Sequence, residues 1–405
     1  MRYFQPVLLA IVGAALATSS TRCALASQSA TVANKKSAPN AYDFYLRAAK
    51  EVEVAPTDDW PNLDNSNQKG AFKSNLERQS FWLNKNRQAL TTLRQGFNYA
   101  YTPPARNSSA DVLIGVRMTL FSQMMKLTEV LSLESRVYRA RREYSMSANT
   151  SIDAIRLGND LSRGALVDVV VGFSIQDAGW VDLAPTIRLL DATSAKDAAK
   201  RLESLDERAL PYNLVLQREK SQGQMLLREI FSSDNWREDY ETTKSQREIE
   251  ATYNSLMDNA IANAKKPYPL RRKSFEMPND AVNQQLFSVF YSDEPNKPSA
   301  AATGTPHERV QAVNRLFATQ LALQAFKRQH NFYPSNLREL VPNYLKKVPQ
   351  DPFSNKKPLL YNRRDDEYSL FSVGPDNKDD KGKPMLPNDV VKTTSRGDIV
   401  AGINR

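Results

Sequence analysis

The stretch that decides the fold of the C-terminal part, residues 306–376, reads PHERVQAVNRLFATQLALQAFKRQHNFYPSNLRELVPNYLKKVPQDPFSNKKPLLYNRRDDEYSLFSVGPD. Its first part repeats apolar residues at steps of three and four, which predicts an amphipathic helix with a broad buried stripe: Val310, Val313, Phe317, Leu321 and Ala325. Phe326 lies off this stripe, which indicates that the helix contacts a second surface.

This helix is predicted to end at Tyr333-Pro334, because the residue before a proline is forced out of the α conformation. Ser335 or Asn336 can then cap a short helix over residues 337–341. Turn chemistry follows in Asp351-Pro352-Phe353, where the proline presets its φ angle and the aspartate can bond the backbone.

Two runs rich in β-forming residues come next, over residues 359–362 and 367–373. The charged residues Arg363-Arg364-Asp365-Asp366 separate them, so the two runs are predicted to pair as an antiparallel hairpin. The long helix packed on this hairpin would form a small α+β module.

The order of these motifs resembles the globular domain of the major pseudopilins of type II secretion systems. The resemblance covers residues 306–405 and rests on the following residues, in this order: Tyr333-Pro334, Leu337, Leu340, Asp351-Pro352-Phe353, Tyr361 and Tyr368-Ser369-Leu370-Phe371-Ser372-Val373-Gly374-Pro375-Asp376. It implies the fold of that domain and a place in a bacterial cell envelope. No Gly-Phe-Thr-Leu-Ile-Glu-like processing site of the pseudopilin kind stands near the start of this chain, so we expect a fold element and not a polymerising subunit.

The resemblance also implies a calcium site, because that family binds calcium in the loop after its last Tyr-x-Leu strand. Calcium takes six to eight oxygen ligands, and four residues are candidates to supply carboxylates: Asp376, Asp379, Asp380 and Asp398. Lys378 and Lys381 are interleaved with them. The spacing is not that of an EF-hand, because Pro387 stands where the glutamate at the twelfth position would be. The alternative interpretation is a solvated polar turn.

The first 26 residues have the three parts of a secretory signal peptide: an early charge at Arg2, an apolar run over residues 7–17, and an Ala24-Leu25-Ala26 cleavage motif. We expect export to the periplasm or beyond, with a flexible leader over residues 27–39. The alternative is an uncleaved segment that anchors the protein, although the run is shorter than the roughly 20 residues of a membrane span. Cleavage would remove Cys23, the only cysteine, and with it any disulfide.

Residues 40–292 are predicted to form a large helical domain, either a helical bundle or an irregular α-solenoid. Within it we expect Asn40 to cap the first helix, one helix over residues 81–94, a helix break near Pro185, and one continuous helix over residues 236–263. The clearest helix has an apolar seam at Leu113, Val116, Leu120, Met124, Leu127 and Leu131.

Residues 293–305 combine Glu, Pro, Asn, Lys, Ser, Ala and Gly and are predicted to link the helical domain to the module of residues 306–405. The predicted fold class is therefore mainly α: a large helical bundle or irregular α-solenoid, followed by a small α+β module.

Few residues point to enzyme chemistry. The only histidines, His307 and His330, flank one predicted helix, so they cannot share a metal ion within it. The chain has no Gly-x-Ser-x-Gly motif, P-loop or Gly-x-Gly-x-x-Gly loop. Paired carboxylates suffice for glycoside hydrolysis, but the adjacent pairs in this chain are typical of solvated turns: Asp58-Asp59, Glu238-Asp239 and Asp365-Asp366.

The net charge of +10 becomes +8 if Arg2 and Arg22 leave with the signal peptide. Basic surfaces bind nucleic acid, anionic lipid or acidic polymers, and the densest clusters are Arg139, Arg141 and Arg142, and Arg271-Arg272-Lys273. Because an exported protein rarely meets DNA, we expect envelope proteins or anionic envelope polymers as partners and no nucleic acid. Membrane association is expected only through an uncleaved N-terminal segment.

Together these patterns predict an exported, non-enzymatic envelope protein with a structural or interaction role. It would be linked to a type II secretion or pilus-like system through a calcium-binding C-terminal module. One alternative is an envelope hydrolase that acts on wall or glycan polymer through carboxylates of the helical domain. Another is a helical scaffold that binds peptides in a long concave groove.

Overall fold

The computed structural model describes residues 38–53, 74–104, 114–273, 275–276, 278–287, 300–385 and 395–401. The predicted signal peptide and nearly all of the predicted leader lie outside this part of the chain. Within it, no helix is both long enough and apolar enough to cross a membrane.

The fold is mainly helical, with a small antiparallel sheet near the C-terminus, as the sequence predicts. The helices of the body are α2 (Ala41–Lys50), α3 (Asn75–Lys85), α4 (Arg87–Gly96), α5 (Ile114–Ala140), α6 (Tyr144–Leu161), α7 (Leu166–Ile187), α8 (Ala192–Arg208), α9 (Tyr212–Ile230), α10 (Trp236–Asp239), α11 (Gln246–Ala264), η1 (Tyr268–Leu270) and α12 (Ala281–Leu286). The C-terminal part follows with α13 (Ala300–Thr303), α14 (Thr305–His330), η3 (Leu337–Leu340), β1 (Leu360–Arg364), β2 (Glu367–Ser372) and β3 (Ile399–Val400).

Two helix caps predicted from the sequence are confirmed. The side chain of Asn40 accepts a hydrogen bond from the backbone N–H of Tyr42 at 3.1 Å. The side chain of Asn336 caps η3 by accepting a hydrogen bond from the backbone N–H of Arg338 at 3.0 Å. Both side chains satisfy a backbone donor that the first turn of a helix leaves without a partner.

The prediction of one helix over residues 236–263 is wrong, because the chain turns between α10 and α11. Ser245 and Glu248 form a capping box in which the serine hydroxyl accepts from the Glu248 N–H and the Glu248 carboxylate accepts from the Ser245 N–H. This pair satisfies two backbone donors at once, so α11 begins at Gln246.

The predicted break near Pro185 is also wrong. Helix α7 continues through Pro185 and ends at Ile187. Pro185 and Val181, one turn earlier, are both exposed. A proline removes the hydrogen bond to the carbonyl four residues before it, and on this exposed face water can satisfy that carbonyl. The cost therefore stays small enough for the helix to complete its last turn.

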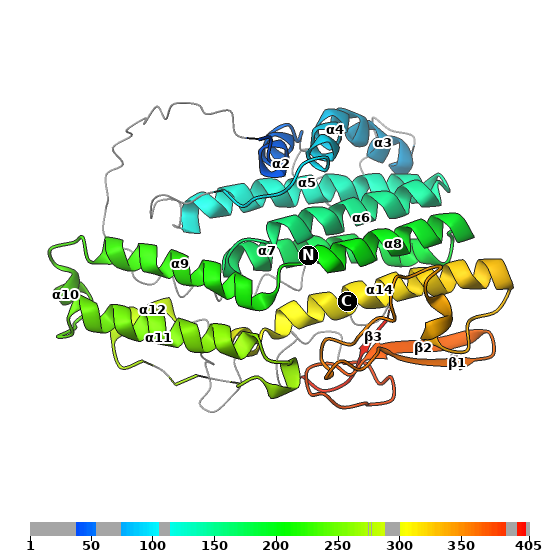
Figure 1. Cartoon of the computed structure of the whole chain (residues 1–405). Helices are drawn as coiled ribbons and strands as arrows, with labels where there is room; N and C mark the ends of the chain where they lie inside the picture. The colour runs from blue at the N-terminus through cyan, green and yellow to red at the C-terminus, as the bar shows by residue number, and fades with distance from the viewer. Residues whose placement is uncertain are drawn as a thin grey trace.

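Helix α14 lies at the centre of the C-terminal half. In Figure 1 it runs between the helices α6, α7 and α8 on one side and the sheet on the other. Helix α8 packs along most of its length, and α7, β2, β3 and η3 contact it as well. Phe326, which lies off the predicted stripe, is buried, so the expected second contact surface is confirmed.

The sheet has the strand order β1-β2-β3 with both pairs antiparallel. The predicted hairpin is confirmed: Leu360 pairs with Phe371 at one end of the β1–β2 register and Arg364 pairs with Glu367 at the turn. Strand β3 adds two residues, Ile399 opposite Ser372 and Val400 opposite Phe371.

One hydrophobic core extends from the helical body into the module. It includes Ile152 of α6, Leu202 of α8, Phe317 of α14 and Leu370 of β2. A second cluster packs α2, α4 and α5 against α6 and α7. Of the predicted linker 293–305, the described residues 300–305 hold α13 and the first residue of α14.

Candidate functional site

The four aspartates singled out from the sequence lie in and beside the loop that follows β2. We call residues 374–382 the acidic loop. Asp398, just before β3, is fully buried beneath it. Its carboxylate accepts hydrogen bonds from the backbone N–H of Gly382 at 2.7 Å and of Asp380 at 3.3 Å. Asp398 therefore anchors the acidic loop to the strand that closes the sheet.

Negative charge accumulates around Asp398. The pKa of its carboxyl group is raised to about 6, chiefly by burial and also by the nearby charges of Asp379 and Asp380, against the lowering effect of the two N–H bonds. Asp379 and Asp380 thus lie close enough to Asp398 for their charges to repel its carboxylate. A bound cation would relieve this repulsion.

Asp376 and Asp379 also shape the backbone of the acidic loop. Asp376 accepts from the N–H of Lys378 at 3.1 Å, and Asp379 accepts from the N–H of Lys381 at 2.8 Å. These are local turn interactions of the kind predicted by the solvated-turn alternative. In the part of the chain that the structure describes, no group of three or more acidic, histidine or cysteine side chains is arranged to hold a metal ion.

Gly374 lets the start of the acidic loop lie against the segment before β3. Gly374 has a φ of +68°, and a Cβ atom at this position would lie 2.7 Å from the carbonyl oxygen of Gly397. Directly after the loop, the carbonyl of Lys383 accepts a hydrogen bond from the N–H of Asp398 at 2.8 Å. The loop is therefore held at both ends.

Asp351 of the Asp-Pro-Phe motif is a structural carboxylate that joins this motif to the end of β2. It is 1% exposed and accepts from the Ser372 hydroxyl at 2.7 Å, the Val373 N–H at 2.8 Å and the Phe353 N–H at 3.0 Å. Burial raises the pKa of the Asp351 carboxyl group, and these hydrogen bonds act in the opposite direction. Its position fixes the start of the acidic loop.

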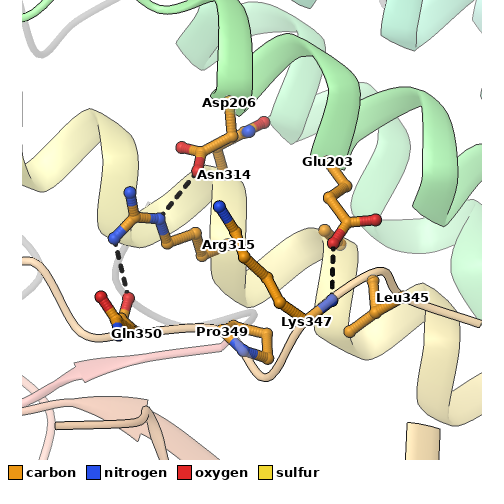
Figure 2. Close-up of a pocket in the computed structure, with 9 residues that line it drawn as sticks. Glu203, Asp206, Asn314, Arg315, Leu345, Lys347, Pro349 and Gln350 are labelled. Atoms are coloured by element: carbon orange, nitrogen blue, oxygen red, sulfur yellow. Dashed lines mark hydrogen bonds and ion pairs between the residues drawn. The ribbon is translucent and has the colours of Figure 1, made fainter. Parts of the chain in front are cut away.

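A pocket of about 190 Å³ lies where the helical body meets the C-terminal module (Figure 2). Arg315 of α14 crosses it, with Nε on the carboxylate of Asp206 at 2.8 Å and one terminal nitrogen on the carbonyl of Gln350 at 2.9 Å. Glu203 of α8 accepts from the backbone N–H of Lys346 with both carboxylate oxygens. The side chain of Lys347 points into the pocket.

This pocket is smaller than the roughly 300–1,000 Å³ of most small-molecule sites. Its charged side chains already serve internal contacts. Glu203 of α8 and Arg315 of α14 bind the backbone of the loop over residues 345–350, and Asp206 of α8 holds Arg315. We therefore interpret this pocket as a gap in the packing between the helical body and the C-terminal module, and not as a ligand site.

The two histidines lie near opposite ends of α14. His307 is buried, with Nε2 2.7 Å from the carbonyl of Leu210, and burial lowers its pKa. His330 packs its ring against Phe326, with ring centroids 4.2 Å apart. Both side chains serve packing in this structure.

Of the adjacent acidic pairs, Asp58-Asp59 lies outside the described residues, and Glu238 and Asp239 are exposed. Asp365 is also exposed, and Asp366 pairs with Lys327 of α14. The hydrolase alternative, which depends on such carboxylates, stays a prediction.

The structure also reveals a charged cluster that sequence reasoning missed. Arg94 of α4 pairs with Glu134 of α5 and with Asp153 of α6, and Arg201 of α8 pairs with the same Asp153 at 2.9 Å. Both carboxylates are largely buried, and each is paired with arginine. The cluster therefore connects α4, α5, α6 and α8. No pattern could have indicated this cluster, because its members are far apart in the sequence.

The basic cluster at the end of α5 is partly used within the fold. Arg139 donates to the carbonyl of Asp182 at 3.1 Å, and Arg141 donates to the hydroxyl of Ser80 at 2.9 Å. In the second cluster, Arg271 forms an ion pair with Glu308 at 2.6 Å.

No family model, curated protein or solved structure matches this chain.

Proposed function

We propose that this protein is an exported, non-enzymatic protein of the bacterial cell envelope with a structural or interaction role. Its C-terminal module binds calcium through the acidic loop and links the protein to a type II secretion or pilus-like system. The observation that carries this proposal is that the pseudopilin-like motifs, which are separated in the sequence, contact one another.

These contacts form two groups. The Tyr361 hydroxyl donates to the carbonyl of Pro334 at 2.8 Å, and the rings of Tyr333 and Tyr368 lie 4.8 Å apart, centroid to centroid. Asp351 bonds Ser372 and Val373 at the other end of the sheet. The residues that carry the resemblance therefore act as one packing unit, as a shared fold requires.

Calcium binding is supported by the charges around Asp398. A buried carboxylate with two acidic neighbours is unfavourable alone and favourable beside a divalent cation. Backbone carbonyl oxygens of the acidic loop can add to these carboxylates, because calcium accepts both kinds of oxygen ligand in flexible geometry.

Isothermal titration of calcium into the full chain at neutral pH tests the calcium part. We expect binding in the unaltered protein and in Asp366→Asn, which changes an exposed carboxylate on the hairpin turn, and none in Asp398→Asn. Calcium at 100 times its Kd should stabilise the folded state by about 2.7 kcal/mol. Equal binding by Asp398→Asn, or no binding by the unaltered protein, would refute this assignment.

Export is tested separately. The full chain with a C-terminal epitope tag, produced in a Gram-negative host, should become accessible to protease when the outer membrane is opened. A tag that stays protected until the inner membrane is lysed would place the protein in the cytoplasm and contradict the proposal, whatever the calcium result.

A further inference from the structure

The turn that follows α11 is a distinct surface feature. We call residues 265–273, which read KKPYPLRRK, the basic turn. Lys265, Lys266, Arg272 and Lys273 are all exposed. Among them Leu270 is 64% exposed, the highest value for a large hydrophobic side chain in the described part of the chain.

Two residues of the basic turn anchor it from beneath. Tyr268 is 6% exposed, places its hydroxyl 2.9 Å from that of Thr305, and packs its ring edge-on against Phe353. Arg271 pairs with Glu308 and donates to the carbonyl of Thr303 at 2.7 Å.

Asn263, the residue before the last of α11, completes this support. Its side chain accepts from the N–H of Arg272 at 2.7 Å and donates to the carbonyls of Arg272 and Ala302. The backbone around Leu270 is therefore fixed by interactions with three other segments, so the exposed side chains are presented by a preorganised turn.

The exposed cations of the basic turn are available for a partner. Within the described residues, Lys265, Lys266, Arg272 and Lys273 form no ion pair with an acidic side chain of this chain. The next acid along the sequence, Glu276, is exposed as well. The exposed apolar side chain of Leu270 thus lies between two exposed cations that precede it in the chain and two that follow it.

We propose that the basic turn binds the surface of an anionic lipid bilayer. Leu270 would enter the boundary between headgroups and acyl chains, while the lysines and arginines contact the phosphates. An acidic polymer or peptide would bind the cations but would leave Leu270 in water. An anionic bilayer would bind the cations and also bury Leu270, so it matches both features of the basic turn. This membrane contact departs from the sequence-based expectation that only an uncleaved N-terminal segment would reach a membrane, and it is independent of calcium.

The first test is flotation of the full chain with vesicles of phosphatidylcholine containing phosphatidylglycerol. Each cation removed should weaken binding about fivefold at low ionic strength, so Lys265→Gln/Lys266→Gln should weaken it about 25-fold. Lys356→Gln/Lys357→Gln, which removes the same charge from exposed positions in the turn before β1, should bind like the unaltered protein. Equal weakening by both pairs would overturn the proposal.

The second test reports on the turn itself and does not depend on how the N-terminal segment behaves. Leu270→Cys in a Cys23→Ser background carries an environment-sensitive fluorophore. Its emission should shift to the blue with phosphatidylglycerol vesicles and not with phosphatidylcholine alone. Flotation without a blue shift would overturn the proposal, and tight binding of heparin without that shift would assign the basic turn to an acidic polymer.

Discussion

At the scale of single residues, Asp351 shows how one carboxylate can organise a module. It accepts three hydrogen bonds from groups that are nearly or fully removed from water, one of them within its own motif and two at the end of β2. Its own pKa is raised by burial, so the fold tolerates an unfavourable charge in order to satisfy these donors.

Asp351→Ala is expected to destabilise the protein by about 2–4 kcal/mol, because it leaves several buried donors without an acceptor. Asp351→Asn retains one acceptor oxygen and should cost less. Chemical denaturation of both variants measures the difference. Glu250→Ala, at an exposed position of α11, is the control and should change stability by less than about 0.5 kcal/mol. A loss at Asp351 no larger than this control would contradict the role given to its carboxylate.

Asp398 gives a pH dependence whose sign follows from its raised pKa. The folded-state pKa of about 6 lies above the ordinary value of 3.8 for an aspartate. The proton therefore binds the folded state more tightly than the unfolded state, and the resulting stabilisation is present at low pH and is lost as the pH rises through about 6. This effect amounts to at most about 3 kcal/mol.

In calcium-free buffer, the stability of the unaltered protein relative to Asp398→Asn should fall between pH 4 and pH 7. Calcium requires the ionised carboxylate, so its stabilising effect should grow over the same interval. Urea denaturation at several pH values, with calcium and with chelator, measures both trends. A difference between the two proteins that does not vary with pH would show that Asp398 titrates normally.

At the scale of elements, the contact between α6 and α7 depends on glycine. A Cβ atom on Gly158 would overlap the backbone carbonyl oxygen of Gly172, and a Cβ atom on Gly172 would overlap the Ser162 hydroxyl and the backbone carbonyl oxygen of Gly158. Helices α6 and α7 therefore approach each other closely where Gly158 faces Gly172. The chain keeps two residues that are unfavourable inside helices because nothing larger fits.

Gly158→Ala should destabilise the protein by about 1–3 kcal/mol, although alanine is the better helix former, because the helices must move apart. Thermal or urea denaturation gives the value. Ser221→Ala on the exposed part of α9 is the comparison and should be nearly neutral. A gain in stability for Gly158→Ala would mean that helix propensity outweighs the close approach.

Helix ends show why some elements could be predicted and others could not. The caps at Asn40 and Asn336 and the Ser245–Glu248 box involve residues only two or three positions apart, so the sequence contains the signal for each of them. The predicted helix over residues 81–94 is instead divided at Asn86 into α3 and α4. Asn86 exchanges two hydrogen bonds of 2.9 Å with the backbone of Glu53, a partner far away in the sequence.

At the scale of the whole molecule, α14 belongs to both halves. Its Phe317 ring stacks on Trp180 of α7, its Arg315 pairs with Asp206 of α8, and its Gln324 donates to the carbonyl of Leu190. The C-terminal module therefore uses the helical body to cover its longest helix.

We accordingly expect residues 305–405 alone to lack a cooperative thermal transition, because the face of α14 that covers α7 and α8 would be exposed to water. Near-ultraviolet circular dichroism and binding of a hydrophobic dye, compared with the full chain, test this. A sharp melt of the fragment near that of the full protein would instead show an independently folding domain.

The sequence by itself determined the class of fold, most of the helices, the β-hairpin and the residues of the acidic loop. These depend on periodicity, caps and turn chemistry, which act over a few residues. Only the tertiary structure decided that Asp398 is buried and that Asp351 joins the Asp-Pro-Phe motif to the end of β2. It also decided that Arg94 pairs with two carboxylates and that α14 is covered on several sides. Each of these depends on contacts between residues far apart in the chain, whose free energy appears only when the segments pack together.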